Sequence, residues 1–309
     1  MSDFAMPFQL TILGTSSALP TSNRYPTAQV LNVRGRFFLI DCGEGTQTQM
    51  RKYKIGFSKI NHIFISHLHG DHIFGLIGLI STFALLGRKN DLHLYAHSEI
   101  QGYLAPQIKF LYPENIPFKI VYHPLSFKKE QQIYEDKAVI IYSFPLDHRI
   151  ATCGFRFEEK PVLPNLVPEK LTEYNIPICN RQAIKEGADF ITDDGQIIPN
   201  SEITLNKHKA RTFAFCSDTR VNESYIESIR NVDLLYHEAT FACDNQALAQ
   251  TTVLSTGADA ARVALDANVG RLIIGHFSAR YKDYTQILKE ATAIFQNTEA
   301  VSDGQVFSI

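Results

Sequence analysis

Three histidines and an aspartate lie within six positions of this chain, in the stretch FISHLHGDH at residues 64–72. The chain has only 11 histidines among 309 residues, so such a cluster needs a common cause. Imidazole and carboxylate groups are the usual ligands of divalent metals such as Zn²⁺. His67 and His69 are two residues apart at the end of an apolar run, so on a strand they point the same way. The stretch therefore predicts a metal-binding turn that follows a β-strand.

Four ligand-type side chains in so short a loop are more than one metal ion can easily use. We expect His67 and His69 to bind one ion, and Asp71 and His72 to bind a second. Each ion then needs ligands from elsewhere, and polar residues that end apolar strands are typical of sites in α/β folds. Three such strand ends occur in PLDH, FCSD and IIGH, which supply His148, Asp218 and His276. Because a carboxylate can bridge two cations, Asp218 is the expected shared ligand.

Hydrophobic content, net charge and cysteine spacing limit the classes of protein to which this chain can belong. Hydrophobic residues make up 45% of the chain, enough for a sizeable core, and the net charge of −2 creates no overall field that would attract nucleic acid. The five cysteines contain no CxxC pair, which argues against a disulfide framework and for a reducing compartment. We find no basic signal segment, and the longest apolar stretch (residues 73–87) is too short to cross a bilayer. A cytoplasmic protein without membrane contact is expected.

Short apolar runs alternate with polar, helix-forming segments in two similar halves of the chain, which predicts a layered α/β sandwich. The strands that matter most for the site are expected at 8–14, 28–33, 36–45, 62–67, 212–218, 232–241 and 271–276. Helices are expected at 46–54, 73–87, 221–231, 255–269 and 284–295.

The middle of the chain breaks this alternation. From about 160 to 209 prolines cluster and hydrophobic periodicity is weak. We interpret this segment as an insertion projecting from the core, neither a strand pair nor a linker. The remainder of residues 1–309 is expected to form a single domain.

Several motifs resemble the metallo-β-lactamase superfamily, and more closely its ribonuclease Z branch. The resemblance runs over nearly the whole chain through GTSSALPT, DCGEGTQTQ, ISHLHGDHIFGL, SDTR, HEATF and GHFSARY. It implies a metallo-β-lactamase-like four-layer αβ/βα sandwich with a projecting arm. It also implies a zinc-dependent hydrolase, an endonuclease that removes 3′ trailers during tRNA processing and leaves a 3′-hydroxyl end. Precursor tRNA is then the implied substrate and a homodimer the implied assembly.

Residue by residue, the resemblance implies two zinc ions per chain. The first ion would be bound by His67, His69, His148 and Asp218. The second would be bound by Asp71, His72, Asp218 and His276. Asp71 would orient the attacking water and take its proton, and Arg280 would lie near the scissile phosphate. The insertion would grip tRNA through a Lys-x-Gly element at Lys185 and Gly187.

Two departures from the family pattern affect these expectations. The insertion lacks the Gly-Pro step often seen there, and residues 155–209 contain seven basic against nine acidic side chains, so tRNA affinity should be modest and salt-sensitive. More seriously, Leu254 stands where the family has a histidine that protonates the leaving oxygen, at the expected start of a helix capped by Ser255 and Thr256. Glu238, the expected catalytic partner of that histidine, would then be an unpaired carboxylate. Slow turnover is expected.

Two alternatives follow from the same residues. One is a related metallo-hydrolase that acts on a small phosphodiester or ester, with Leu254 marking the changed substrate. The other is a weakly catalytic, metal-bound RNA-binding protein with complete ligands and no general acid.

Overall fold

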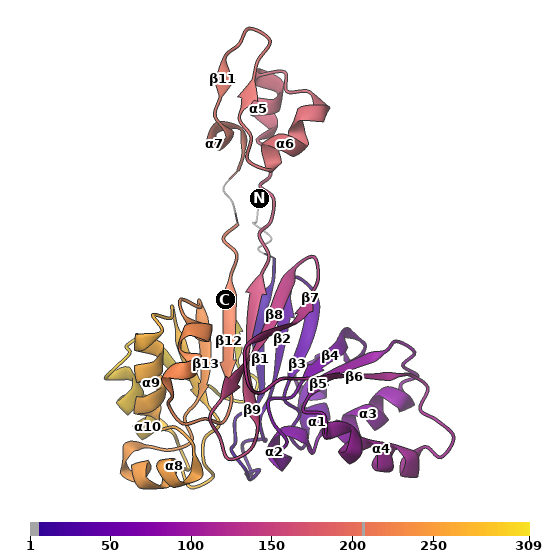
Figure 1. Ribbon diagram of the computed structural model, residues 1–309, viewed down its shortest axis with the longest axis vertical. Coiled ribbons are helices and arrows are strands. Elements are labelled where there is room, and N and C mark those ends of the chain that lie inside the picture. The colour runs from indigo at the N-terminus through magenta and orange to yellow at the C-terminus, as the bar shows by residue number, and fades with distance from the viewer. Residues whose placement is uncertain (1–5, 206–207) are drawn as a thin grey trace. The chain divides into compact units, whose positions relative to one another are not determined.

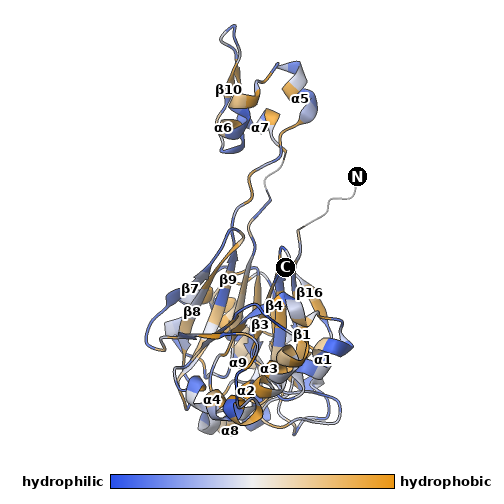
Figure 2. Cartoon of the chain, turned by 90° about the vertical axis from the view of Figure 1, so that its right-hand side faces the viewer, coloured by the Kyte–Doolittle hydropathy of each residue, from blue (hydrophilic) through white to orange (hydrophobic). Residues whose placement is uncertain are grey.

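The computed structural model describes residues 6–205 and 208–309, and its contacts divide the chain into two units. The larger unit combines the described residues up to Glu158 with Arg211–Ile309, and the smaller one is Glu159–Ala210. Each unit has a hydrophobic core of its own. Figure 2 shows hydrophobic colouring on strands and helices of both units.

Two seven-stranded mixed sheets form the larger unit (Figure 1). The first has the order β16-β1-β2-β3-β4-β5-β6. Its strands are β1 (Phe8–Gly14), β2 (Ala28–Val33), β3 (Arg36–Ile40), β4 (Ile60–Phe64), β5 (Leu92–Ala96), β6 (Ile120–Pro124) and β16 (Val306–Ser308). The second has the order β15-β14-β13-β12-β9-β8-β7. Its strands are β7 (Gln131–Glu135), β8 (Val139–Leu146), β9 (Thr152–Glu159), β12 (Thr212–Cys216), β13 (Leu234–Glu238), β14 (Leu272–Gly275) and β15 (Thr298–Ala300).

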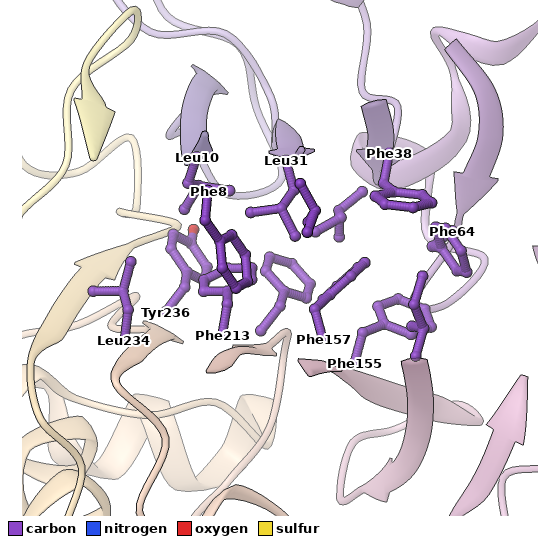
Figure 3. Packing of buried hydrophobic residues seen from close by; sticks show 14 of the residues in the cluster. Phe8, Leu10, Leu31, Phe38, Phe64, Phe155, Phe157, Phe213, Leu234 and Tyr236 are labelled. Atoms are coloured by element: carbon purple, nitrogen blue, oxygen red, sulfur yellow. The ribbon is translucent and has the colours of Figure 1, made fainter. Parts of the chain in front are cut away.

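The two sheets pack face to face through large apolar side chains (Figure 3). Phe38 and Phe64 of the first sheet contact Phe157 of the second, with ring centroids 5.8 Å apart in both pairs. Phe64 also meets Phe155 edge-on at 5.6 Å, a favourable arrangement for aromatic pairs. This alternation of inward apolar residues explains why the sequence predicted these strands well.

Helices cover the outer faces of the sheets. The helices of the larger unit are α1 (Thr46–Lys52), α2 (Gly70–Ile73), α3 (Leu76–Leu85), α4 (Ile100–Leu111), α8 (Gln246–Thr252), α9 (Gly257–Asp266) and α10 (Thr285–Thr292). Figure 1 shows α3 and α4 beside β4–β6, and α9 and α10 beside β12 and β13. Helix α3 buries Leu76, Leu79, Ile80 and Phe83, the spacing of one helical face. The predicted four-layer αβ/βα sandwich is thereby confirmed.

Some predicted elements were wrong or missed. Residues 221–231 form two 3₁₀ turns, η3 (Glu223–Tyr225) and η4 (Glu227–Ile229), in place of one helix. Segment 73–87 is divided between α2 and α3 and is not fully buried, since Leu85 is 80% exposed. Elements β7, β15, β16, α4 and α8 were not predicted, and two further 3₁₀ turns are η1 (Phe57–Lys59) and η5 (Cys243–Asn245).

The smaller unit packs short elements around its own apolar cluster. Its elements are α5 (Pro168–Glu173), η2 (Ile178–Asn180), α6 (Arg181–Lys185), β10 (Phe190–Ile191), β11 (Ile197–Ile198) and α7 (Asn200–Ile203). Its core consists of Ile176, Ile184, Phe190, Ile198 and Ile203. Strands β10 and β11 pair in antiparallel fashion, so the expectation of no strand pair here was wrong. None of the helices in the described ranges has the length and hydrophobicity needed to cross a membrane.

Candidate metal centre

The carboxyl ends of several strands bring all seven predicted ligands together. His67 and His69 lie in the loop after β4, and Asp71 and His72 lie in the short helix α2 that follows. The other three follow β8, β12 and β14, and they are His148, Asp218 and His276. The larger unit thus assembles one site from both of its sheets.

The first group comprises His67, His69, His148 and Asp218, whose ligand atoms lie within 4.8 Å of one another. His69 Nδ1 is 3.0 Å from His67 Nε2 and 3.4 Å from His148 Nε2. Oδ2 of Asp218 is 3.8 Å from Nε2 of both His67 and His148. Four atoms of suitable type therefore converge on one point.

The second group shares the other oxygen of Asp218. Asp71, His72 and His276 lie within the same 4.8 Å limit of one another. Oδ2 of Asp71 is 3.5 Å from His72 Nε2 and 3.4 Å from His276 Nε2. Oδ1 of Asp218 is 3.5 Å from His72 Nε2 and 3.2 Å from His276 Nε2. Asp218 is thus placed between the two groups.

These spacings fit a bound cation. Ligand atoms about 2.0–2.2 Å from a tetrahedral ion lie roughly 3.3 Å apart, close to the separations in both groups. His72 Nε2 and Asp218 Oδ1 are buried and have no hydrogen-bond partner among the described residues. Buried polar atoms without partners are costly, and a metal ion would satisfy both. The donor set indicates a divalent metal.

In His72, His148 and His276 the nitrogen that does not face the ligand groups is held by the protein. His72 Nδ1 donates to Asp41 Oδ2 at 2.8 Å, and His148 Nδ1 donates to the Val253 carbonyl at 2.8 Å. His276 Nδ1 is 3.0 Å from Thr240 Oγ1. Such contacts fix the tautomer, so in His72, His148 and His276 Nε2 is left free for a metal.

Asp41 and Ser66 form a buried hydrogen-bond network at the site, which we did not predict from the sequence. Asp41 accepts from the Ser66 amide at 2.8 Å and from the Ser66 hydroxyl at 2.9 Å. The Ser66 hydroxyl also contacts His67 Nδ1 at 3.0 Å and Ser217 Oγ at 2.9 Å. Asp41 has a φ of 54°, a left-handed conformation uncommon outside glycine. The available signal was Asp41 itself, the first residue of the quoted DCGEGTQTQ motif.

Burial sets the protonation of the first group. It lowers the pKa of His67 well below its ordinary value, and it also lowers the pKa of His69 and His148. Neutral imidazoles keep the lone pair that a metal needs. Burial opposes ionisation of Asp71, but His72 and His276 hold its pKa below the ordinary value.

Glu238, the last residue of β13, is fully buried and is not unpaired, so that expectation was wrong. Oε1 accepts from the backbone amides of Ser255 at 2.6 Å and Thr219 at 3.3 Å. Oε2 accepts from the amide of Thr240 at 2.9 Å and from its hydroxyl at 2.8 Å. Burial and the Asp218 carboxylate raise the pKa of Glu238 to about 8. The three backbone amides can only donate, and this favours the carboxylate form against the effect of burial.

This arrangement links Glu238 to the metal centre through Thr240. The Thr240 hydroxyl donates to Glu238, so its oxygen accepts from His276 Nδ1. Glu238 therefore orients a ligand of the second group in addition to any role near the substrate. Sequence reasoning could not reveal this role of Glu238, because its contacts with Ser255 and Thr219 join segments that are distant in the sequence.

A cavity of about 650 Å³ opens over the metal groups. Leu254 and Arg280 line it together with Asp71 and Asp218, and Arg149 adds a second exposed cation. Leu254 does not open a helix as expected. It lies in the link between α8 and α9, and Thr256 alone caps α9 through a capping box with Asp259. Ser255 instead donates its hydroxyl to the Thr219 carbonyl.

Lys185 belongs to the smaller unit, at the end of α6. It lines a cavity of about 580 Å³ in that unit, together with Arg181 and Ile178. Gly187 has a φ of 113°, which an L-residue rarely adopts, so glycine is needed in this Lys-x-Gly turn.

Comparison with known proteins assigns the family. A family model described as Anti-Pycsar protein Apyc1 matches residues 8–108, about the first third of the chain. A curated protein named Ribonuclease Z from Bacteroides thetaiotaomicron is 46% identical over 302 residues, covering 98% of this chain and 95% of its own. The chain belongs to the ribonuclease Z family. A Ribonuclease Z from Phocaeicola vulgatus is 47% identical over 291 residues, covering 94% of each chain.

Solved structures agree with this membership. The short form of human tRNase Z matches with a TM-score of 0.71 and 26% identity, over 97% of this chain and 99% of its own. The metallo-β-lactamase fold protein YhfI from Bacillus subtilis matches with a TM-score of 0.69 at 18% identity, over 98% and 100% of the chains, which shows the shared fold. As a member of the ribonuclease Z family, the chain has the metallo-β-lactamase fold and is a hydrolytic endoribonuclease.

Proposed function

We propose that this protein is a two-zinc endoribonuclease that removes 3′ trailers from precursor tRNA and leaves a 3′-hydroxyl end. The observation that carries the proposal is the pair of four-atom ligand groups that share Asp218, in a chain of the ribonuclease Z family. Imidazole and carboxylate donors at these spacings suit zinc, and each group would offer four donor atoms to an ion. Two ions held there supply Lewis acidity to an in-line phosphoryl displacement.

The chain's own residues take the remaining roles. Asp71 Oδ2 faces the second ligand group and accepts from the Ala18 amide at 2.7 Å, which leaves Oδ1 to orient the attacking water and accept its proton. Arg280 and Arg149 are exposed in the same cavity and bind phosphate oxygens. Leu254 offers no proton, so the leaving 3′-oxygen departs with little help from this position and turnover is slow.

The smaller unit serves as the tRNA-binding arm in this proposal. Arg181 and Lys185 line its cavity, and Arg181 Nε is buried without a hydrogen-bond partner among the described residues. A guanidinium in that state is suited to phosphate. The arm is otherwise acidic on balance, so its contacts position substrate and add modest affinity.

We also propose a cytoplasmic homodimer. Leu85, Leu86, Phe110 and Leu111 are exposed apolar side chains at the ends of α3 and α4. The two helices are in contact, because Ser81 Oγ in α3 is 2.9 Å from the hydroxyl of Tyr112, the residue that follows α4. An apolar patch of this kind is typical of an interface. All five cysteines are unpaired, which suits a reducing compartment.

The test is cleavage of a precursor tRNA with a 3′ trailer by protein of measured metal content. We expect close to two zinc equivalents and a product ending in a 3′-hydroxyl at the acceptor stem, identified by mass. His67→Ala should lose at least one equivalent and the activity. Hydrolysis of a small aryl phosphodiester with no cleavage of the precursor by zinc-loaded protein would contradict the proposal.

A further inference from the structure

Two exposed apolar side chains stand in the wall of the catalytic cavity, where a purely electrostatic phosphate site would not need them. Leu19 is 64% exposed and Phe74 is 57% exposed, and both line the 650 Å³ cavity. Exposed large apolar groups inside a pocket mark a binding surface for an apolar part of the ligand.

Both residues line this cavity together with Asp71, and they come from different segments of the chain. The Phe74 ring lies over Gly70, the residue before Asp71, so closely that a Cβ at Gly70 would be 2.2 Å from two ring carbons. Leu19 follows Ala18, whose amide donates to Asp71 Oδ2 at 2.7 Å. Glycine at position 70 is therefore what allows the aromatic ring to lie beside the metal centre.

The same cavity also contains charged groups. Arg149 and Arg280 are exposed cations in it, and four of the predicted metal ligands, His69, Asp71, His148 and Asp218, also line it. RNA presents the matching pattern, because each anionic phosphate is flanked by the flat apolar face of a base. An aromatic ring next to a phosphate site is the usual stacking platform for an unpaired base.

We propose that Phe74 stacks a nucleobase of the RNA next to the scissile phosphate, with Leu19 in the lining of the same cavity. The inference rests on the proposed function and adds a specificity-determining contact to it. Stacking requires an unpaired base, so this contact favours cleavage where the acceptor stem passes into the single-stranded 3′ end. Leu254 extends the apolar lining of the same cavity.

The test compares unmodified precursor tRNA with two versions that have an abasic residue immediately 5′ or 3′ of the cleavage site. Phe74→Ala should lower kcat/KM on the unmodified precursor by roughly five- to hundredfold, the range for loss of one stacked base. Phe74→Tyr should keep most of the activity. Leu265→Ala, which removes a large apolar side chain that is 55% exposed on α9 and does not line this cavity, is the matched control and should change little.

The abasic substrates decide between stacking and a structural effect. On one of them the wild-type protein should fall to the level of Phe74→Ala, and the substitution should cause no further loss. An equal loss from Phe74→Ala on all three substrates, or no loss on any, would overturn the inference. Failure of the zinc-loaded wild type to cleave the unmodified precursor would instead overturn the proposed function itself.

Discussion

At the scale of single residues, the metal centre depends on side chains that do not touch the metal positions. Asp41 accepts from the amide and hydroxyl of Ser66 and from Nδ1 of His72, so one carboxylate orients ligands of both groups. Outer contacts of this kind raise the basicity of an imidazole ligand and fix its direction. Their loss should therefore be visible in metal affinity before it is visible in the fold.

Asp41→Asn should weaken binding of the metal at the His72 group by about 10- to 100-fold. An asparagine has one acceptor oxygen, so its amide NH₂ must face either the Ser66 donors or the His72 Nδ1–H. Competition with a chromogenic chelator should resolve a weakened ion beside a less affected one. Asp136→Asn is the control, because Asp136 pairs with Arg36 outside the metal centre. Equal metal affinity in the two variants would contradict the role of Asp41.

Leu254→His should raise the rate of RNA cleavage by about tenfold or more, because a histidine in this cavity can protonate the leaving oxygen. The position is well defined, since the next residue, Ser255, is fixed by its amide to Glu238 and by its hydroxyl to Thr219. Single-turnover rates on precursor tRNA provide the measurement.

The gain from Leu254→His should be smaller on an aryl phosphodiester, whose leaving group needs little protonation. Equal gains on both substrates would show that the histidine acts by binding phosphate. An unchanged rate on both, at constant metal content, would show that another group supplies the proton.

At the scale of elements, the sequence predicted what depends on local patterns. Strands such as β1, β2 and β12 follow from apolar runs closed by turn residues, and they were predicted at their observed positions. The helix predicted at residues 221–231 was wrong. This segment forms two 3₁₀ turns, in which only Tyr225 and Ile229 are buried. Helix α8 was missed because QALAQTT is short and largely polar, so its existence depends on tertiary contacts.

The end of α8 contains strain that a substitution can release. Val253 has a φ of 57°, and a β-branched residue is a genuine outlier in this left-handed region. Its carbonyl holds His148 Nδ1, so the strained backbone orients a predicted metal ligand. This conformation costs of order 1–3 kcal/mol for a residue other than glycine.

Val253→Gly should raise the free energy of unfolding by about 1 kcal/mol, because relief of strain exceeds the extra entropy of glycine in the unfolded chain. Urea unfolding of the metal-loaded protein is the measurement. Metal content should not change, since the contact to His148 uses the backbone carbonyl. Asn268→Gly is the control, because asparagine tolerates its φ of 52° and the gain there should be smaller. A destabilised Val253→Gly would show that the valine side chain contributes more than its backbone costs.

At the scale of the whole molecule, the site depends on how the chain brings strand ends of the two sheets together. HxHxDH is local, and the sequence alone predicted a metal-binding turn there. His148 and Asp218 are strand-end residues whose importance depends on two sheets meeting. The strand-end pattern suggested both and made Asp218 the shared ligand, and the resemblance to a known family then assigned His148 to one of the two ions. Contacts such as Thr240 to His276 cross 36 positions, and no local pattern encodes them. The sequence could therefore predict the ligands but not the residues that orient them.

The smaller unit can be removed without cutting the sandwich. Strands β9 and β12 are antiparallel neighbours in which Glu158 lies opposite Thr212, so a short Gly/Ser turn can replace residues 160–209. The excised unit has an apolar cluster of its own, and none of its members belongs to the cluster between the two sheets. The variant should keep its metal content and cooperative thermal unfolding.

Excision should raise KM for precursor tRNA by about tenfold or more, while hydrolysis of a small aryl phosphodiester survives. The reason is that phosphate contacts far from the reacting bond add affinity and register but take no part in the chemistry. The double substitution Arg181→Ala and Lys185→Ala in the intact chain should reproduce part of the loss. It should also reduce the salt dependence of binding, because a protein with fewer cations releases fewer counterions from the RNA. If both activities fall together while both metals stay bound, the smaller unit shapes the catalytic cavity and is not a separate arm for the RNA.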